Sequence, residues 1–261
     1  LPYMWGLAIF FGVLFIYTVF GGMKGVSIAA GFQGAVMTGA TLSLLIGTLI
    51  YVNKTGGYQA GFEAIAQSGD NAFMTPYHTW QATLNLLLIN GIALIGQPQV
   101  VQSAFGVKNT QSIHGTILIG LFFVVIWQFS MSFIGVSSTV AGINPEVTDH
   151  TSSIMALTVL PSWLVGILIA GAMGAIQSTV GSMMIVLSSS LTKDLYLEFI
   201  NKNASESAIK KVSMGTTGIG MVIAIILAIN PPDLLQNIVN YAMGGLASSF
   251  FAPLLLGLVW K

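Results

Sequence analysis

The chain alternates between long apolar stretches and shorter polar ones. A run of about 20 apolar residues is long enough to cross a bilayer as a helix. Lipid leaves an unclosed chain no other way to satisfy its backbone groups, so each such run is predicted to be helical. Seven runs qualify: Met4–Phe20, Val26–Val52, Gln81–Phe105, Ile113–Val140, the apolar part of Gly166–Phe199, Val212–Ile229 and Leu234–Val259.

The polar stretches are predicted to be connections at the membrane surfaces. A short hinge covers Gly21–Lys24, and a long polar segment over residues 53–80 is expected to contain a surface helix around Gln59–Ala66. Ala141–Leu160 is predicted to be a loop, and Thr192–Lys211 a polar amphipathic connector. The sixth run ends at Pro231-Pro232. The fold class is therefore an all-α polytopic membrane protein.

Composition supports this class and excludes several functions. Hydrophobic residues make up 54% of the chain and charged residues 6%, whereas soluble domains carry about 25% charged residues. The net charge is zero, so nucleic acid is not an expected partner. There is no cysteine, no HExxH motif and no nucleophile with an adjacent base, so no enzymatic activity is expected. The chain starts inside an apolar run and is expected to be a piece of a longer protein.

Charge placement predicts the orientation. When the connections are assigned alternately to the two sides of the membrane, one side receives a single lysine, Lys54. The other side receives all remaining lysines, which are Lys24, Lys108, Lys193, Lys202, Lys210, Lys211 and Lys261. Lysine-rich connections are cytoplasmic in plasma-membrane proteins. The C-terminal end of this chain is therefore predicted to be cytoplasmic.

A polar cluster interrupts the fifth run at Ala175-Ile176-Gln177-Ser178-Thr179. Ser178 and Thr179 follow Ala175 by three and four residues, so a helix places both hydroxyls beside the Ala175 carbonyl. Three oxygens of this kind suit a hard cation such as sodium. Alternatively, the hydroxyls bond back to the carbonyl and allow close helix packing. Spacing alone leaves both interpretations open.

Two other runs carry polar groups at depth. Gly96-Gln97-Pro98 interrupts the third run, and proline removes a backbone donor there. This is either an ordinary proline kink or a broken helix that lines a binding cavity. In the seventh run, Asn240 and Tyr241 are candidates to face a cavity. Lone glutamines such as Gln33 and Gln128 are expected to form hydrogen bonds between helices.

Several motifs together resemble the sodium/solute symporter family. Tyr17–Gly22 is similar to the Gly-Gly hinge of the family, and Gln33 is similar to the Gln of its next helix. Gly96–Gln99 is similar to its Gly-x-Pro break. The most specific motif is Ala175–Thr179, followed by Ser188–Ser190 and Lys193–Tyr196. The pattern Pro231-Pro232-Asp233, Gly244-Gly245 and Pro253–Leu258 is similar to the pantothenate-transporting branch.

The resemblance implies a leucine-transporter-type fold built from two inverted five-helix repeats. This chain would cover about core helices four to ten, so the N-terminal helices of the full-length protein would be missing partners. Residues 1–52 would end the first repeat, 53–80 would be an extracellular connection, and 81–261 would form the second repeat with its cytoplasmic connector at 192–211.

The resemblance also implies functional residues. Sodium would bind the Ala175 carbonyl and the hydroxyls of Ser178 and Thr179. The solute site would be lined by Asn90, Gly91, Leu94, Gln97, Asn240 and Tyr241.

The sequence departs from the family pattern at several positions. Ala30 replaces a usual Asp, Ser103 a usual basic residue, Gln177 a usual Met and Gly181 an acid or polar residue. No acid remains in the spans, so proton coupling is not expected, and Phe123 disfavours a sugar substrate.

The leading hypothesis is sodium-coupled uptake of a small polar organic solute, for example pantothenate or another carboxylate, across the plasma membrane. The alternative is a transporter-like sensor domain that binds solute without transport.

Overall fold

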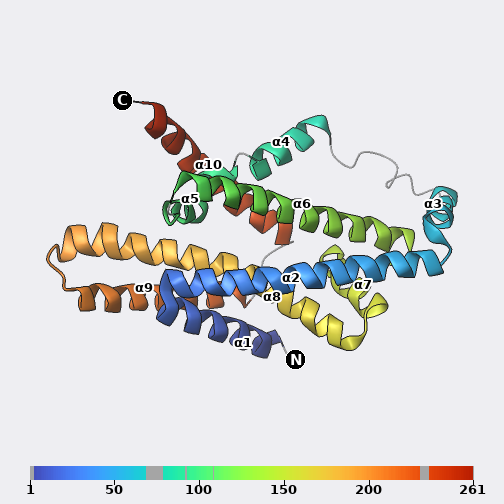
Figure 1. Cartoon of the computed structure of the whole chain (residues 1–261), viewed down its shortest axis with the longest axis horizontal. Helices are drawn as coiled ribbons and strands as arrows, with labels where there is room; N and C mark the ends of the chain where they lie inside the picture. The colour runs from blue at the N-terminus through green and yellow to red at the C-terminus, as the bar shows by residue number, and fades with distance from the viewer. Residues whose placement is uncertain (1–2, 69–78, 92, 108, 230–234, 261) are drawn as a thin grey trace. The chain divides into compact units, whose positions relative to one another are not determined.

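The computed structural model describes residues 3–68, 79–91, 93–107, 109–229 and 235–260 (Figure 1). The described secondary structure is entirely helical. The chain forms two compact units, and α2 (Gly21–Lys54) and α8 (Ser162–Ser189) each contribute to both. Each unit is described separately below.

The first unit combines residues 1–35 with 171–233. It contains α1 (Tyr3–Phe15), the π-helix η1 (Ile16–Phe20), the first part of α2, the last part of α8, the π-helix η5 (Ser190–Ile200) and α9 (Glu206–Ala228). Its core forms where Phe11 and Leu14 of α1 pack against Met221 of α9. Small residues on α8 bring the helices close together, since a Cβ on Gly181 would contact Val26 and Leu14.

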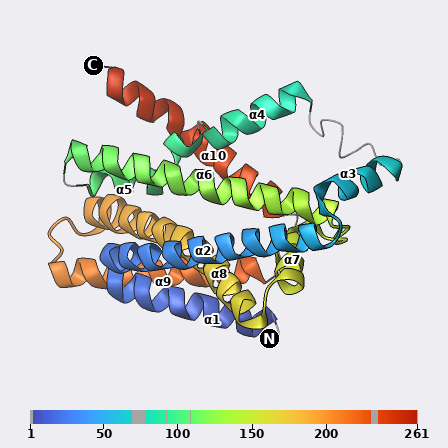
Figure 2. The ribbon, with the colours of Figure 1, turned by 45° about the vertical axis from the view of Figure 1, so that its right-hand side comes forward.

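The chain reverses direction between α1 and α2 at Gly22. Gly22 has φ 54° and ψ −150°, which is outside the helical region. Residues with a Cβ rarely adopt such a conformation, so glycine suits this position. Figure 2 shows α1 and the start of α2 lying side by side after the reversal. The predicted hinge at Gly21–Lys24 therefore contains a change of chain direction, although only Gly22 within it is non-helical.

The second unit combines residues 36–170 with 234–261. Its described helices, besides parts of α2 and α8, are α3 (Gly57–Gln67), α4 (Trp80–Gly91), η3 (Ala93–Gly96), α5 (Pro98–Phe105), α6 (Thr110–Val140), η4 (Thr148–His150), α7 (Thr151–Val159) and α10 (Leu235–Val259). The core forms around Leu44, Ile134 and Met155, which are almost completely buried. The α6 helix exposes large apolar side chains such as Phe122 and Phe129, as a helix surrounded by lipid would.

Five helical stretches of the described residues are long and apolar enough to span a membrane. One of them, Met4–Lys54, has 51 residues, and a straight helix of that length would measure about 75 Å. It includes the turn at Gly22 and thus both of the first two predicted spans. The third predicted span is divided among α4, η3 and α5, and none of these reaches spanning length alone. The count of seven spans remains a prediction.

Two predicted connections are more helical than expected. The predicted loop Ala141–Leu160 contains α7, because Met155 and Ala156 are fully buried against the core of the second unit. The predicted connector Thr192–Lys211 is helical except near residues 201–205, because η5 continues α8 to Ile200. Ser205 then caps α9 by accepting a hydrogen bond from the Ala208 N–H at 3.3 Å, which starts this helix before the apolar run. The Pro231-Pro232 break lies outside the described residues.

The predicted surface helix near Gln59–Ala66 is confirmed as α3, and it packs on the end of α6. The Tyr58 hydroxyl lies 2.9 Å from the Ser137 hydroxyl, and the rings of Tyr58 and Phe133 are in contact. A Cβ on Gly61 would lie 2.5 Å from the Val140 carbonyl oxygen. The absence of a side chain at Gly61 therefore permits the contact between α3 and α6.

We expect Gly61→Ala to lower the free energy of unfolding by about 1–3 kcal/mol, because the added methyl group overpacks against backbone that cannot rotate away. The thermal unfolding midpoint of the full-length protein in detergent measures this effect. Gly135→Ala on α6 is the control, since a Cβ there meets nothing within 4 Å. An unchanged midpoint for Gly61→Ala would contradict the close contact.

Candidate ion and solute sites

The polar cluster of α8 has the geometry that helical spacing predicts. The Ser178 hydroxyl donates to the Ala175 carbonyl at 2.8 Å, and the Thr179 hydroxyl donates to the same carbonyl at 3.3 Å. Ala175 and Ser178 are half-buried, and Thr179 is exposed. Three uncharged oxygens thus converge on one point of the helix surface.

This geometry suits both of the interpretations that the sequence leaves open. The hydroxyls bond back to the helix, as serine and threonine commonly do in apolar helices. A cation could bind the same three oxygens once the hydroxyl protons rotate away from the Ala175 carbonyl, because this exposes lone pairs on all three atoms. The assignment of sodium to this cluster therefore remains a prediction.

A buried glutamine within the cluster connects α8 to two other helices. Gln177 is only 7% exposed, and its side-chain N–H donates to the Phe10 carbonyl of α1 at 2.9 Å. Its side-chain oxygen accepts a hydrogen bond from the Gln33 amide of α2 at 3.1 Å. The expectation that Gln33 bonds to another helix is confirmed. The sequence placed Gln177 in the polar cluster and marked it as a departure from a family pattern, but it indicated no partner for this side chain.

Ser188, which follows the cluster, connects α8 to α9. The Ser188 hydroxyl lies 2.8 Å from the Ser213 carbonyl and 3.0 Å from the Thr216 hydroxyl. Ser188 is 1% exposed. This part of the motif therefore forms hydrogen bonds between helices.

The predicted break in the third span is confirmed. The α4 helix ends at Gly91, η3 ends at Gly96, and α5 begins at Pro98. Gln97 lies between them in an extended conformation, with φ −88° and ψ 113°. Proline at the first position of α5 costs no hydrogen bond, because that N–H would have no partner in the helix.

Gln97 occupies the break with a buried side chain that has an unused donor. It is 5% exposed, and its side-chain oxygen accepts a hydrogen bond from the Gln99 amide at 2.7 Å. Its side-chain nitrogen is buried and has no hydrogen-bond partner within the described part of the chain. An unpaired buried amide costs stability, so it is a candidate to bind a ligand.

The break lies against α10 at backbone distance. A Cβ on Gly96 would lie 3.0 Å from the Ala247 Cα and 3.4 Å from the Phe251 N. These contacts lie beyond Asn240 and Tyr241 along α10, and Tyr241 is 83% exposed. That Asn240 and Tyr241 face the solute remains a prediction. Gly91 is the last residue of α4. The side chains of Asn90 and Leu94 are not among those that the structure describes.

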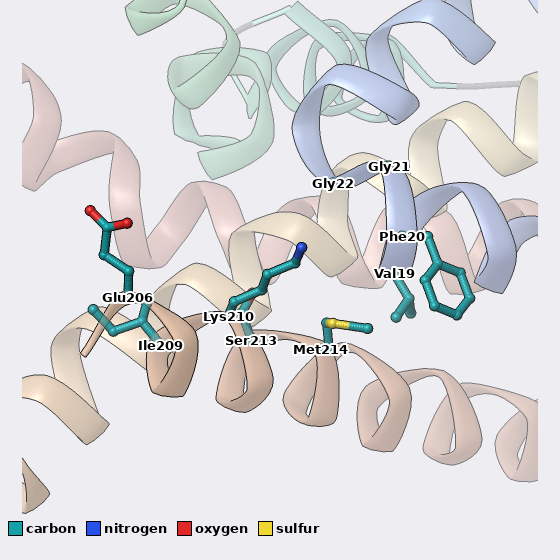
Figure 3. A pocket seen from close by; sticks show the side chains of 9 residues that line it. All are labelled: Val19, Phe20, Gly21, Gly22, Glu206, Ile209, Lys210, Ser213 and Met214. Atoms are coloured by element: carbon teal, nitrogen blue, oxygen red, sulfur yellow. The ribbon is translucent and has the colours of Figure 1, made fainter. Parts of the chain in front are cut away.

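The first unit also has an open cavity of about 450 Å³ beside the turn at Gly22 (Figure 3). Apolar side chains and the first turns of α9 line it, and none of the predicted site residues does. The Lys210 side chain extends towards the turn, and Glu206 points to the other side (Figure 3). The lining residues are Val19, Phe20, Gly21, Gly22, Glu206, Ile209, Lys210, Ser213 and Met214.

The chain is similar to curated transporters over nearly its whole length. It is 30% identical to the sodium/pantothenate symporter of Haemophilus influenzae, and the match covers 100% of the chain and 54% of the relative. It is 25% identical to the osmoregulated proline transporter OpuE of Bacillus subtilis (99% and 53%) and to the sodium/proline symporter of Escherichia coli (94% and 50%). The chain thus spans about half the length of the curated relatives it matches.

No solved structure matches the chain. The model of the Sodium:solute symporter family matches residues 1–261. This match and the apolar helices together indicate a multi-pass plasma-membrane protein. The matching family consists of transporters rather than enzymes. The chain therefore belongs to the sodium:solute symporter family.

Proposed function

We propose that this chain is part of a symporter that couples the downhill movement of sodium to the uptake of a small carboxylate solute. The observation that carries the proposal is the family match over residues 1–261. The relatives are named for pantothenate and proline, and both compounds contain a carboxylate. None of the relatives reported above is named as a sensor.

The sodium site in this proposal is the oxygen cluster on α8. The Ala175 carbonyl and the hydroxyls of Ser178 and Thr179 supply three ligands, and helices outside this chain supply the others. Sodium there braces α8 against those helices and favours the outward-open state. Solute binding then permits closure and release of both to the cytoplasm.

The solute site in this proposal is the break between η3 and α5. The start of α5 carries the partial positive charge of a helix N-terminus, which favours a carboxylate. The buried Gln97 amide offers an N–H donor at the same place. We infer that this amide donates to the solute carboxylate. Asn90, Gly91, Leu94, Asn240 and Tyr241 complete the proposed site.

The sodium site is tested by removing both hydroxyls. We expect Ser178→Ala/Thr179→Ala to reduce sodium-stimulated uptake by the full-length protein at least about tenfold, because two ligand oxygens are lost. The control is Ser43→Ala/Thr116→Ala, which removes one serine and one threonine that each bond to the carbonyl four residues earlier. Uptake that keeps its sodium dependence in the first variant would show that the hydroxyls only pack the helix.

The solute site is tested by reversing its preference for charge. We expect Gln97→Glu to raise the KM for pantothenate or proline by about tenfold or more, because a carboxylate replaces the donor. The KM should rise less for the neutral analogues pantothenol and prolinamide than for the two carboxylates. Gln111→Glu, at an exposed position in the first turn of α6, is the control for added charge. Equal losses for charged and neutral solutes would contradict the assignment.

The orientation is tested by labelling single cysteines on intact cells with a membrane-impermeant maleimide. This chain contains no cysteine, so the cysteines to be replaced are those elsewhere in the full-length protein. We expect Lys54→Cys to be labelled from outside and Lys202→Cys only after the cells are opened, because lysine-rich connections are cytoplasmic. Both positions are exposed. The opposite pattern would reverse the proposed topology.

A further inference from the structure

The Gln177 side chain connects the turn of α8 that carries the proposed sodium site to the helices around it. It uses both of its functional atoms, one as a donor to Phe10 and one as an acceptor from Gln33. Its backbone carbonyl accepts a third hydrogen bond from the Tyr17 hydroxyl at 3.0 Å. A buried glutamine in an apolar helix would be costly without these partners.

The two connections differ in strength. Two hydrogen bonds connect Gln177 to α1 and η1, and each includes a backbone carbonyl that cannot move independently of its helix. A single bond between two side chains connects Gln177 to α2. The Gln33 side-chain oxygen has no hydrogen-bond partner among the described residues. The Gln33–Gln177 bond is therefore the weaker connection.

The α2 and α8 helices approach closely enough for the Gln33–Gln177 bond to control the position of the α8 backbone. A Cβ on Gly174 would lie 2.9 Å from the Gln33 Cγ, so the Gln33 side chain lies directly on the α8 backbone. Gln177 is two residues after Ala175 and one before Ser178. A shift of its backbone therefore moves the Ala175 carbonyl and the hydroxyls of Ser178 and Thr179 with it.

We propose that Gln177, together with Gln33, is a positioning residue that sets the sodium affinity of the α8 cluster. The uncharged glutamine pair holds the three oxygens where they can bind one ion together. This inference rests on the proposed sodium site. It adds that the affinity depends on hydrogen bonds made by a residue that does not touch the ion.

The test uses Gln33→Met and Gln177→Leu in the full-length protein, singly and together. Neither new side chain forms a comparable hydrogen bond, and leucine is used at position 177 because methionine is the usual family residue there. Each single change leaves buried polar atoms of the other glutamine unpaired, and the double change removes both members of the pair. We therefore expect the thermal midpoint to fall in each single variant and to recover in the double variant.

Sodium affinity should behave differently from stability. We expect the sodium concentration for half-maximal uptake to rise about tenfold in Gln177→Leu, as for other residues that orient the ligands of an ion. It should rise less in Gln33→Met and stay raised in the double variant. The KM for solute at saturating sodium should change less than twofold. Thr38→Val is the control, because it removes the bond from the Trp127 indole elsewhere in the chain.

The outcomes separate this inference from the proposed site. If the Ser178/Thr179 variant abolishes sodium dependence but the glutamine variants leave sodium affinity unchanged, the inference fails alone. If sodium affinity recovers with stability in the double variant, the glutamine pair is only structural. If sodium dependence survives the loss of both hydroxyls, the sodium site itself is wrong. Should Gln177→Leu not accumulate in the membrane, Gln33→Met alone gives the same comparison with Thr38→Val.

Discussion

Hydrocarbon offers no hydrogen bonds, so a polar group inside a membrane-spanning helix is costly unless it finds a partner within the protein. Several of the described hydroxyls find this partner locally. Ser178, Thr179 and Ser182 donate to carbonyls three or four residues earlier on α8. Gln177 cannot do so and bonds to α1 and α2 instead. In our proposal, the locally bonded hydroxyls of Ser178 and Thr179 bind the ion, and the more distant partners of Gln177 position them.

The same requirement explains how the broken helix is tolerated. A backbone that leaves the helix between η3 and α5 needs protein around it. Gly96 permits α10 to approach at backbone distance and provides that cover. One amide of the break, the side-chain nitrogen of Gln97, remains buried without a described partner. The break thereby combines a covered backbone with one unused donor, which suits a polar solute better than a simple kink does.

Glycines determine where the helices meet. Gly174 and Gly181 bring α2 and α1 onto α8, and Gly61 brings α3 onto α6. Close approach is the main source of helix association in lipid, where burial of apolar surface provides little driving force. Gly22 has a different role, because its positive φ lets the chain reverse between α1 and α2. The long apolar region Met4–Lys54 can therefore form two spans.

The sequence alone determined the class of protein, the break at Gly96-Gln97-Pro98 and the convergence of Ser178 and Thr179 on Ala175. Each of these depends on composition or on spacing within one helix, which local geometry fixes. The partners of Gln177, the unpaired amide of Gln97 and the burial of α7 depended on tertiary structure. They join residues more than a hundred positions apart, or depend on which face of a helix is covered. No periodicity along the chain encodes those contacts, because packing between helices decides them.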